Sequence, residues 1–209
     1  MKMLSKVLML SLCVTAMAFG AIIDDFNTDF GPASDGDPAI VLPYGIQVGK
    51  LVVDKTFGPN TNFVDTNITG GLFNVSTGFN TQGLGGALYT GLWDLSSTGQ
   101  TLSIDLIFKD VIGGTIEFWV SSDGGTTRST SGLLALPNGF PATISALLST
   151  FTGPANLSSI TAVGFTAYTV LNQDYAFDNF KEYVVPEPGT YALMAAGLLG
   201  LFAIRRRKV

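Results

Sequence analysis

The feature that most restricts the fold of this chain is a period-two alternation of apolar and polar residues in short segments. In the clearest segment, residues 101–108, every second residue from Leu102 to Phe108 is apolar and most of the others are polar. After a glycine-containing turn at 110–114, residues 115–121 repeat the alternation, which predicts a β-hairpin. No segment before Tyr191 carries a helical apolar stripe, so we expect little helix.

Short apolar runs with the same character recur along the chain and are bounded by Gly, Asn, Ser and Thr. They predict strands at 47–53, 71–75, 87–92, 101–108, 115–121, 133–136, 160–168 and 175–184. Residues 54–69 and 77–86 are expected to be long loops, and the Asp-Gly-Gly sequence within 121–127 a turn from which a further strand returns. Many short strands without helical crossovers predict an all-β fold, a two-layer antiparallel β-sandwich of jelly-roll type.

The C-terminal 25 residues form a tail in three parts. In the sequence Val-Pro-Glu-Pro-Gly at 185–189, the two prolines favour an open, extended backbone that a processing enzyme can reach. The uncharged run 191–204 would be about 21 Å long as a helix, shorter than the ~30 Å hydrocarbon layer but able to span it with local thinning. Four cations follow and are expected to stay in the cytoplasm, which places the preceding domain outside.

The N-terminus has the features of a secretory signal. Lys2 and Lys6 precede an apolar run at 7–14, and Ala-Met-Ala at 16–18 has the small-x-small form that signal peptidase recognises. We therefore divide the chain into a signal peptide at 1–21, an exported domain at 22–184 and the tail at 185–209. Cys13, the single cysteine, lies in the signal, so the mature domain depends on packing for stability.

The exported domain is acidic. Between Ile22 and Val185, five cations face fifteen carboxylates, a formal charge of −10. This balance disfavours nucleic acid and anionic lipid headgroups as partners, because Lys and Arg dominate the binding of phosphate. Neutral glycans, cations and basic surfaces remain open, as does a role of the charge in solubility alone.

The order of proline motif, apolar run and basic end resembles the PEP-CTERM sorting signal of bacterial exported proteins. The resemblance implies processing by an exosortase, inner-membrane anchoring through a C-terminal transmembrane helix, and final display at the cell surface or in an exopolysaccharide matrix. It implies a sorting motif at Pro186, Glu187 and Pro188, and a cytoplasmic stop at Arg205, Arg206, Arg207 and Lys208.

Two segments near the ends of the domain resemble the first and last strands of galactose-binding-like jelly rolls, a carbohydrate-binding-module type of sandwich. They are Ile-Ile-Asp-Asp-Phe-Asn at 22–27 and Tyr-Ala-Phe-Asp-Asn-Phe at 175–180. The resemblance implies that these strands lie side by side and that a structural calcium ion has candidate ligands in Asp24, Asp25 and Asp178. Turn formation is the alternative role of these residues.

Catalytic residues are scarce. The chain has no histidine, and the mature domain has no cysteine, which excludes Ser-His-Asp and Cys-His nucleophiles and imidazole-based zinc or iron sites. A carboxylate pair could still hydrolyse glycans, but Glu117 and Asp105 are expected on solvent-facing strand positions. We predict a protein that is not an enzyme and that needs no cofactor.

Aromatic residues give the remaining functional candidates. Trp119 lies on the Glu117 side of its strand and is expected to be exposed. Trp93 lies next to Asp94 at the end of a strand, and Tyr44 lies beside Pro43. They are candidate glycan contacts, with burial under loops as the alternative. We predict an exported surface or matrix protein with a non-catalytic structural or adhesive role. The alternatives are a carbohydrate-binding module that recognises exopolysaccharide and, third, a glycan-active enzyme.

Overall fold

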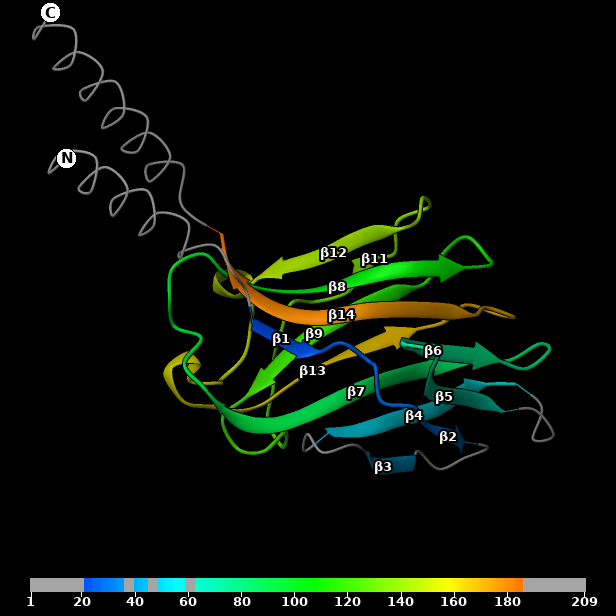
Figure 1. Ribbon diagram of the computed structural model, residues 1–209, viewed down its shortest axis with the longest axis horizontal. Coiled ribbons are helices and arrows are strands. Elements are labelled where there is room, and N and C mark those ends of the chain that lie inside the picture. The colour runs from blue at the N-terminus through cyan, green and yellow to red at the C-terminus, as the bar shows by residue number, and fades with distance from the viewer. Residues whose placement is uncertain (1–20, 36–39, 45–48, 59–62, 186–209) are drawn as a thin grey trace, which may run out of the picture.

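The computed structural model describes residues 21–35, 40–44, 49–58 and 63–185 (Figure 1). Their regular structure is almost entirely β, with two short 3-10 helices. The strands are β1 Ala21–Asp24, β2 Phe30–Asp35, β3 Ile40–Tyr44, β4 Gly49–Phe57, β5 Val64–Thr69, β6 Leu72–Thr77, β7 Gln82–Trp93, β8 Gln100–Lys109, β9 Thr115–Ser121, β10 Ser129–Thr130, β11 Leu134–Ala135, β12 Ala142–Leu147, β13 Ile160–Tyr168 and β14 Tyr175–Val184, and the helices are η1 Leu148–Thr150 and η2 Leu157–Ser159. In this part of the chain no helix has the length and apolar character to cross a membrane. The expected signal helix and tail helix lie outside the described residues.

The strands form two antiparallel sheets that pack face to face, which confirms the predicted sandwich (Figure 1). The first sheet has the order β12-β8-β14-β6-β5-β2, with β1 pairing β14. The second sheet has the order β10-β9-β13-β7-β4-β3, with β11 pairing β9. Strands that are consecutive in sequence therefore often lie in different sheets, as a two-layer fold of crossing connections requires.

A cluster of phenylalanines occupies the space between the sheets. Phe26 precedes β2, Phe73 and Phe177 come from the first sheet, and Phe165 comes from the second; all four are at most 1% exposed. The ring centroids of Phe73 and Phe165 are 5.0 Å apart in an edge-to-face arrangement, so they join the two sheets directly. The alternation found in the sequence supplies this core from every second strand residue.

The predicted hairpin of 101–108 with 115–121 is wrong. Strand β8 pairs with β12 and β14 in the first sheet, whereas β9 pairs with β13, β10 and β11 in the second. Both strands have one apolar face, and the fold buries these faces against each other across the core. The connection crosses between the sheets through Gly113 and Gly114, which both have positive φ angles.

The apolar alternation also changes face near the end of β8. Leu102 and Leu106 point into the core as predicted, but Phe108 is 43% exposed and the next residue, Lys109, is buried. The cause is a register shift against β14 at this point, where an extra residue on β8 disturbs the ladder.

Two segments expected to be loops contain strands. Strand β5 lies within 54–69, and β7 begins at Gln82 inside the glycine-rich stretch. The glycines of β7 mark close packing rather than a loop: a Cβ on Gly85 would overlap the side chains of Thr66 and Val75 in the opposite sheet. Strands β2, β3, β10 and β12 were also not assigned from the sequence, although the return from the Asp-Gly-Gly turn that β10 makes was expected.

The first and last strands lie side by side, as the jelly-roll resemblance implied. Ala21 of β1 pairs with Glu182 of β14, and Val185 donates a backbone hydrogen bond to Gly99 O at 2.8 Å. The described chain therefore starts and finishes at one end of the sandwich, called here the tail end (Figure 1). The connections β6–β7, β8–β9, β11–β12 and β13–β14 lie at the opposite end, called here the far end.

Candidate functional site

The last described residues hold the point at which the chain leaves the sandwich. Strand β14 ends at Val184, and the hydrogen bond of Val185 to Gly99 O holds the chain where it leaves the sandwich. Gly99 has a φ angle of +81°, and a Cβ there would overlap the carbonyl oxygen of Val185. The predicted sorting residues Pro186, Glu187 and Pro188, and the cations from Arg205 to Lys208, lie outside the described residues.

Trp119 lies on the outer face of the second sheet, but it is not exposed. The side chain is only 1% exposed, which corrects the expectation from the sequence. Its indole ring lies over Gly164, where a Cβ would overlap the ring, and it packs with Leu88. The guanidinium of Arg128 stacks on it at 3.8 Å from the ring centroid. The indole N–H has no hydrogen-bond partner among the described residues.

The residues that cover Trp119 belong to the connection between β9 and β10. Ser121 Oγ accepts hydrogen bonds from Asp123 N and Gly125 N, and Gly124 N donates to Thr161 Oγ1 at 2.8 Å. Hydrogen bonds from Ser121 and then Thr127 lower the pKa of the Asp123 carboxyl to about 2. The connection is therefore braced against the sheet, and it holds Arg128 in place.

Three polar side chains, Arg128, Glu117 and Tyr168, form a group beside the covered tryptophan. We call this group the sheet-face cluster. Tyr168 Oη donates to Glu117 Oε2 at 3.5 Å. Burial raises the pKa of the Tyr168 phenol, and the nearby Glu117 charge raises it further. Burial lowers the pKa of Arg128, and Glu117 partly offsets that effect. The cluster combines a planar cation, a carboxylate and an aromatic ring on one sheet face, groups that can hydrogen-bond and stack against sugar rings.

The other two aromatic candidates have different surroundings. Trp93 is half-buried and packs against the main core, with its ring against Gly91. Tyr44 is the last residue of β3, and its side chain is not among those the structure describes. The two tryptophans therefore lie in different places. Trp93 packs against the main core, whereas Trp119 packs with Leu88 and Ala162 in a separate apolar cluster.

The two aspartates proposed for calcium at the first strand accept hydrogen bonds from protein donors. Asp24 accepts from Phe26 N and from the Tyr89 hydroxyl, each at 2.7 Å. Asp25 accepts from Asn27 N at 3.2 Å and from its side-chain amide at 2.8 Å. These contacts tie the start of the domain to the second sheet and to its own turn.

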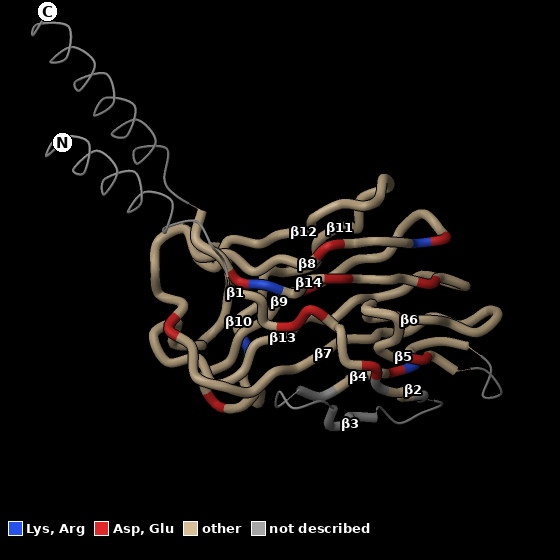
Figure 2. The backbone as a smooth tube through the Cα atoms, viewed as in Figure 1, with Lys and Arg blue, Asp and Glu red and all other residues tan. Residues whose placement is uncertain are grey.

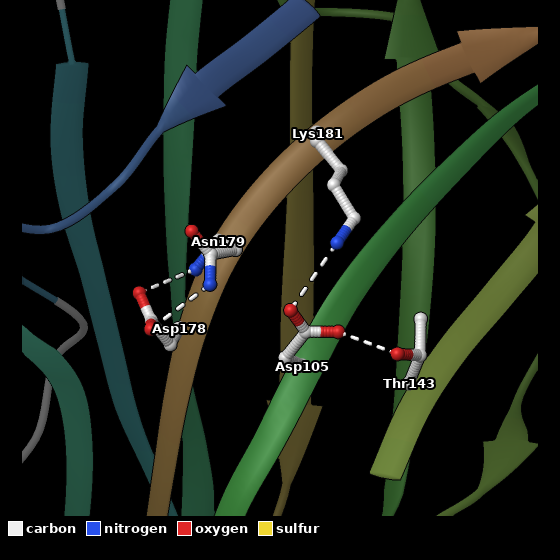
Figure 3. A network of polar contacts seen from close by, with 5 residues as sticks. All are labelled: Asp105, Thr143, Asp178, Asn179 and Lys181. Carbon is white, nitrogen blue, oxygen red and sulfur yellow. Dashed lines mark hydrogen bonds and ion pairs between the residues drawn. The ribbon is translucent and has the colours of Figure 1, made fainter. Parts of the chain in front are cut away.

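Asp178, the third proposed calcium ligand, lies in the middle of β14 (Figure 3). It accepts hydrogen bonds from the backbone and side-chain nitrogens of Asn179, at 2.7 and 2.9 Å, and Asn179 has a φ angle of +51°. Within the described ranges, no three Asp, Glu, His or Cys side chains gather in a way that could hold a metal ion. Structural calcium stays a prediction; it would be tested by melting the protein with and without a chelator.

The carboxylates considered for glycan hydrolysis lie on opposite sides of the molecule. Asp105 is on the outer face of the first sheet, where Lys181 Nζ is 3.2 Å from its Oδ2 and Thr143 Oγ1 donates to its Oδ1 at 2.6 Å (Figure 3). Glu117 is on the outer face of the second sheet, between the core residues Ile116 and Phe118. A glycosidase needs its two carboxylates about 5 to 9.5 Å apart, which this arrangement does not provide.

The described residues thus define an antiparallel β-sandwich protein of jelly-roll type. At its C-terminus, residues 184–208 match the PEP-CTERM protein-sorting motif, beginning at the last residue of β14. The order of elements that resembled this signal in the sequence is therefore confirmed. No curated protein matches the chain.

Solved structures with a similar fold include carbohydrate-binding modules and a larger enzyme. The family 11 carbohydrate-binding module of the cellulase Lic26A-Cel5E of Clostridium thermocellum is 18% identical, with 81% of this chain and 96% of that chain covered and a TM-score of 0.46. The solution structure of CtCBM11 is 18% identical over 83% and 99% of the two chains, with a TM-score of 0.49. The agarase AgWH50C is 11% identical over 80% of this chain and 25% of that chain, with a TM-score of 0.49. At these TM-scores the likeness carries no argument, and both the fold and the function are argued from this chain's own residues.

Proposed function

We propose that the chain is an exported protein with a non-catalytic structural or adhesive role at the cell surface or in the extracellular matrix. The observation that carries the proposal is the PEP-CTERM motif at 184–208, which follows directly on the last strand of the sandwich. The sandwich would be secreted through its N-terminal signal, held at the inner membrane by the tail, and then cut from the tail by an exosortase. The cations at the C-terminus would remain in the cytoplasm.

The composition and the geometry support a non-catalytic role. The chain has no histidine, its single cysteine lies in the predicted signal, and the two strand carboxylates examined for hydrolysis lie on opposite outer faces. The sandwich has a continuous apolar core between its two sheets. These features are expected of a domain that acts through its surface.

The sorting role is tested by replacing Pro186, Glu187 and Pro188 together with alanine in a host that has an exosortase. We expect the variant to accumulate as an uncut precursor in the inner membrane fraction, while the wild-type protein is cut and leaves it. Pro154→Ala is the control, because Pro154 is an exposed proline outside the motif. Equal processing of the triple variant and the wild type, measured by intact mass, would refute the sorting role.

A second candidate function, recognition of an exopolysaccharide, is favoured by the sheet-face cluster. Tyr168 and Arg128 present an aromatic ring and a guanidinium beside Glu117 on a face braced by hydrogen bonds. Trp119 would contribute only if Arg128 moved from its ring, and Trp93 and Tyr44 remain proposed contacts. We expect Tyr168→Ala to lose retention in affinity electrophoresis with the host polysaccharide.

The matched control for that experiment is Thr143→Ala, on the outer face of the first sheet. If the wild-type protein and both variants migrate alike with and without polysaccharide, the second candidate function is wrong. The sorting experiment is independent of this result, since processing depends on the tail.

A further inference from the structure

The far end of the sandwich exposes an unusual number of large apolar side chains. Loop residues are normally polar, and large apolar patches on soluble proteins mark interaction sites. Here eight side chains, each between 37% and 79% exposed, lie at or beside the far-end connections. We call them the far-end apolar surface: Phe57, Phe63, Phe79, Phe108, Val111, Ile112, Phe140 and Leu171.

The loops that carry this surface are joined by hydrogen bonds. Gln173 Nε2 donates to the carbonyl oxygens of Val111 and Gly113, at 2.7 and 3.3 Å, which links the β13–β14 and β8–β9 connections. Asn172 N donates to Thr81 O at 3.1 Å, which links the β13–β14 and β6–β7 connections. The apolar side chains are therefore held outward by a braced framework.

The remaining contacts extend the framework to both edges of the far end. Gly78 N donates to Phe63 O at 3.0 Å. On the other side, Lys109 Nζ donates to Leu136 O at 3.2 Å and to Asn138 Oδ1 at 3.3 Å, and the Phe108 and Phe140 rings meet at 5.9 Å. A preorganised apolar surface loses little entropy when it binds a partner.

Two carboxylates of the far end accept hydrogen bonds from its backbone. Asp110 Oδ1 accepts from Asp174 N at 2.8 Å, and Asp174 Oδ1 accepts from Thr77 N at 3.0 Å. Lys109 is only 5% exposed, and burial lowers the pKa of its ammonium group. The far end thus combines outward apolar groups with one buried cation, Lys109, and with carboxylates that are hydrogen-bonded to neighbouring loops.

We propose that the far-end apolar surface binds a second copy of this chain, end to end. With ~200 Å² for a large apolar side chain, the eight side chains expose on the order of 800 Å², which is the area that each partner buries in a standard interface. Because these eight side chains are apolar, the same patch can meet its own copy, as the isologous contact of a symmetric dimer requires.

The charge of the whole domain favours an end-to-end orientation of two joined copies. Figure 2 shows carboxylates along the sandwich and few cations, in keeping with the formal charge of −10 between Ile22 and Val185. An acidic body is repelled by anionic lipid surfaces, which disfavours a membrane as the occupant. Contact between two far ends keeps the acidic bodies as far apart as two joined copies can be, and it leaves the two tail ends at opposite extremities.

The test is the oligomeric state of the purified full-length protein in detergent, measured by sedimentation velocity over a range of protein concentrations. We expect a monomer–dimer equilibrium that Ile112→Asp and Leu171→Asp each weaken at least about ten-fold, because a buried, unpaired carboxylate opposes the contact. The control is Leu92→Asp, which places the same charge on a residue 87% exposed on β7, outside the far-end connections. This control should dimerise as the wild type does.

Three results would overturn the proposal. One is a monomer at every concentration up to about 100 µM, far above the dissociation constants of ordinary stable interfaces. Another is dimerisation that the far-end variants do not weaken, which would assign the contact to the tail or to another face. The third is loss of polysaccharide retention in the far-end variants with dimerisation intact, which would make the surface a glycan contact.

Because processing of the tail is not involved, none of these results depends on the sorting experiment. Phe140→Asp provides a second variant if either of the others fails to fold, judged by its melting temperature.

Discussion

Truncation of Phe165 should remove a large part of the stability of the sandwich. The side chain is 1% exposed, and its ring lies 5.0 Å from Phe73, 5.2 Å from Phe180, 6.2 Å from Phe177 and 6.4 Å from Phe26 between centroids. A buried Phe→Ala change costs about 3–5 kcal/mol in free energy of unfolding, because apolar contacts are lost and a cavity remains. Domains of ordinary stability have only ~5–15 kcal/mol in total. Phe165→Ala is thus expected to leave a marginal fold.

Urea unfolding followed by circular dichroism measures this loss. With a typical slope of about 2 kcal/mol per molar urea, we expect the midpoint to fall by roughly 2 M. Leu92→Ala is the control: this side chain is 87% exposed on β7, and its removal should change stability by less than about 0.5 kcal/mol. If Phe165→Ala and Leu92→Ala had the same midpoint, the phenylalanine cluster would not be the main source of stability, and the reasoning from burial and ring contacts would be refuted.

Two further predictions concern the turns. Gly114→Ala should destabilise the protein more than Gly132→Ala in thermal melts: both glycines have positive φ, but a Cβ at Gly114 would overlap the Tyr175 hydroxyl, whereas Gly132 has open space; equal melting temperatures would contradict this. The hydrogen bonds that lower the pKa of Asp123 from 3.8 to about 2 should stabilise the fold above pH 3.8, and this contribution should disappear as the pH falls through about 2. An NMR titration of the Asp123 carboxyl with a midpoint near 4 would show that the hydrogen bonds from Ser121 and Thr127 are not formed in solution.

The strands were predictable from the sequence where both neighbours of a core residue are polar. Leu102 and Ile104 alternate with Thr101 and Ser103, and this local pattern is enough to assign an extended segment with one apolar face. It contains no information on which strand lies beside it. The pattern allows β8 to lie beside β9 in one sheet or to face it across the core. The long-range pairing of β8 with β14 decides between the two arrangements.

For a similar reason, the sequence predicted which face of the sheet carries Trp119 but not that the side chain is buried. Its position between Phe118 and Val120 assigns it correctly to the outer face of its sheet. Its burial depends on Gly164, which lies 45 positions later in the chain and leaves room for the ring, and on Arg128, which returns over it. Neither contact has a local signal, so a pattern of alternation alone overstates the exposure of outer-face aromatics.

The strand topology places together, at the far end, apolar residues that no sequence pattern connects. Phe79, Ile112 and Leu171 are apolar residues within turn-like segments, and each alone is an ordinary surface residue. The three connections that carry them follow β6, β8 and β13, and Figure 1 shows these strands running toward the same end. Antiparallel pairing therefore gathers the three side chains on one end of the molecule, opposite the end from which the sorting motif continues. The proposed contact of this surface with a second copy would join two domains end to end, in keeping with the structural or adhesive role that we propose.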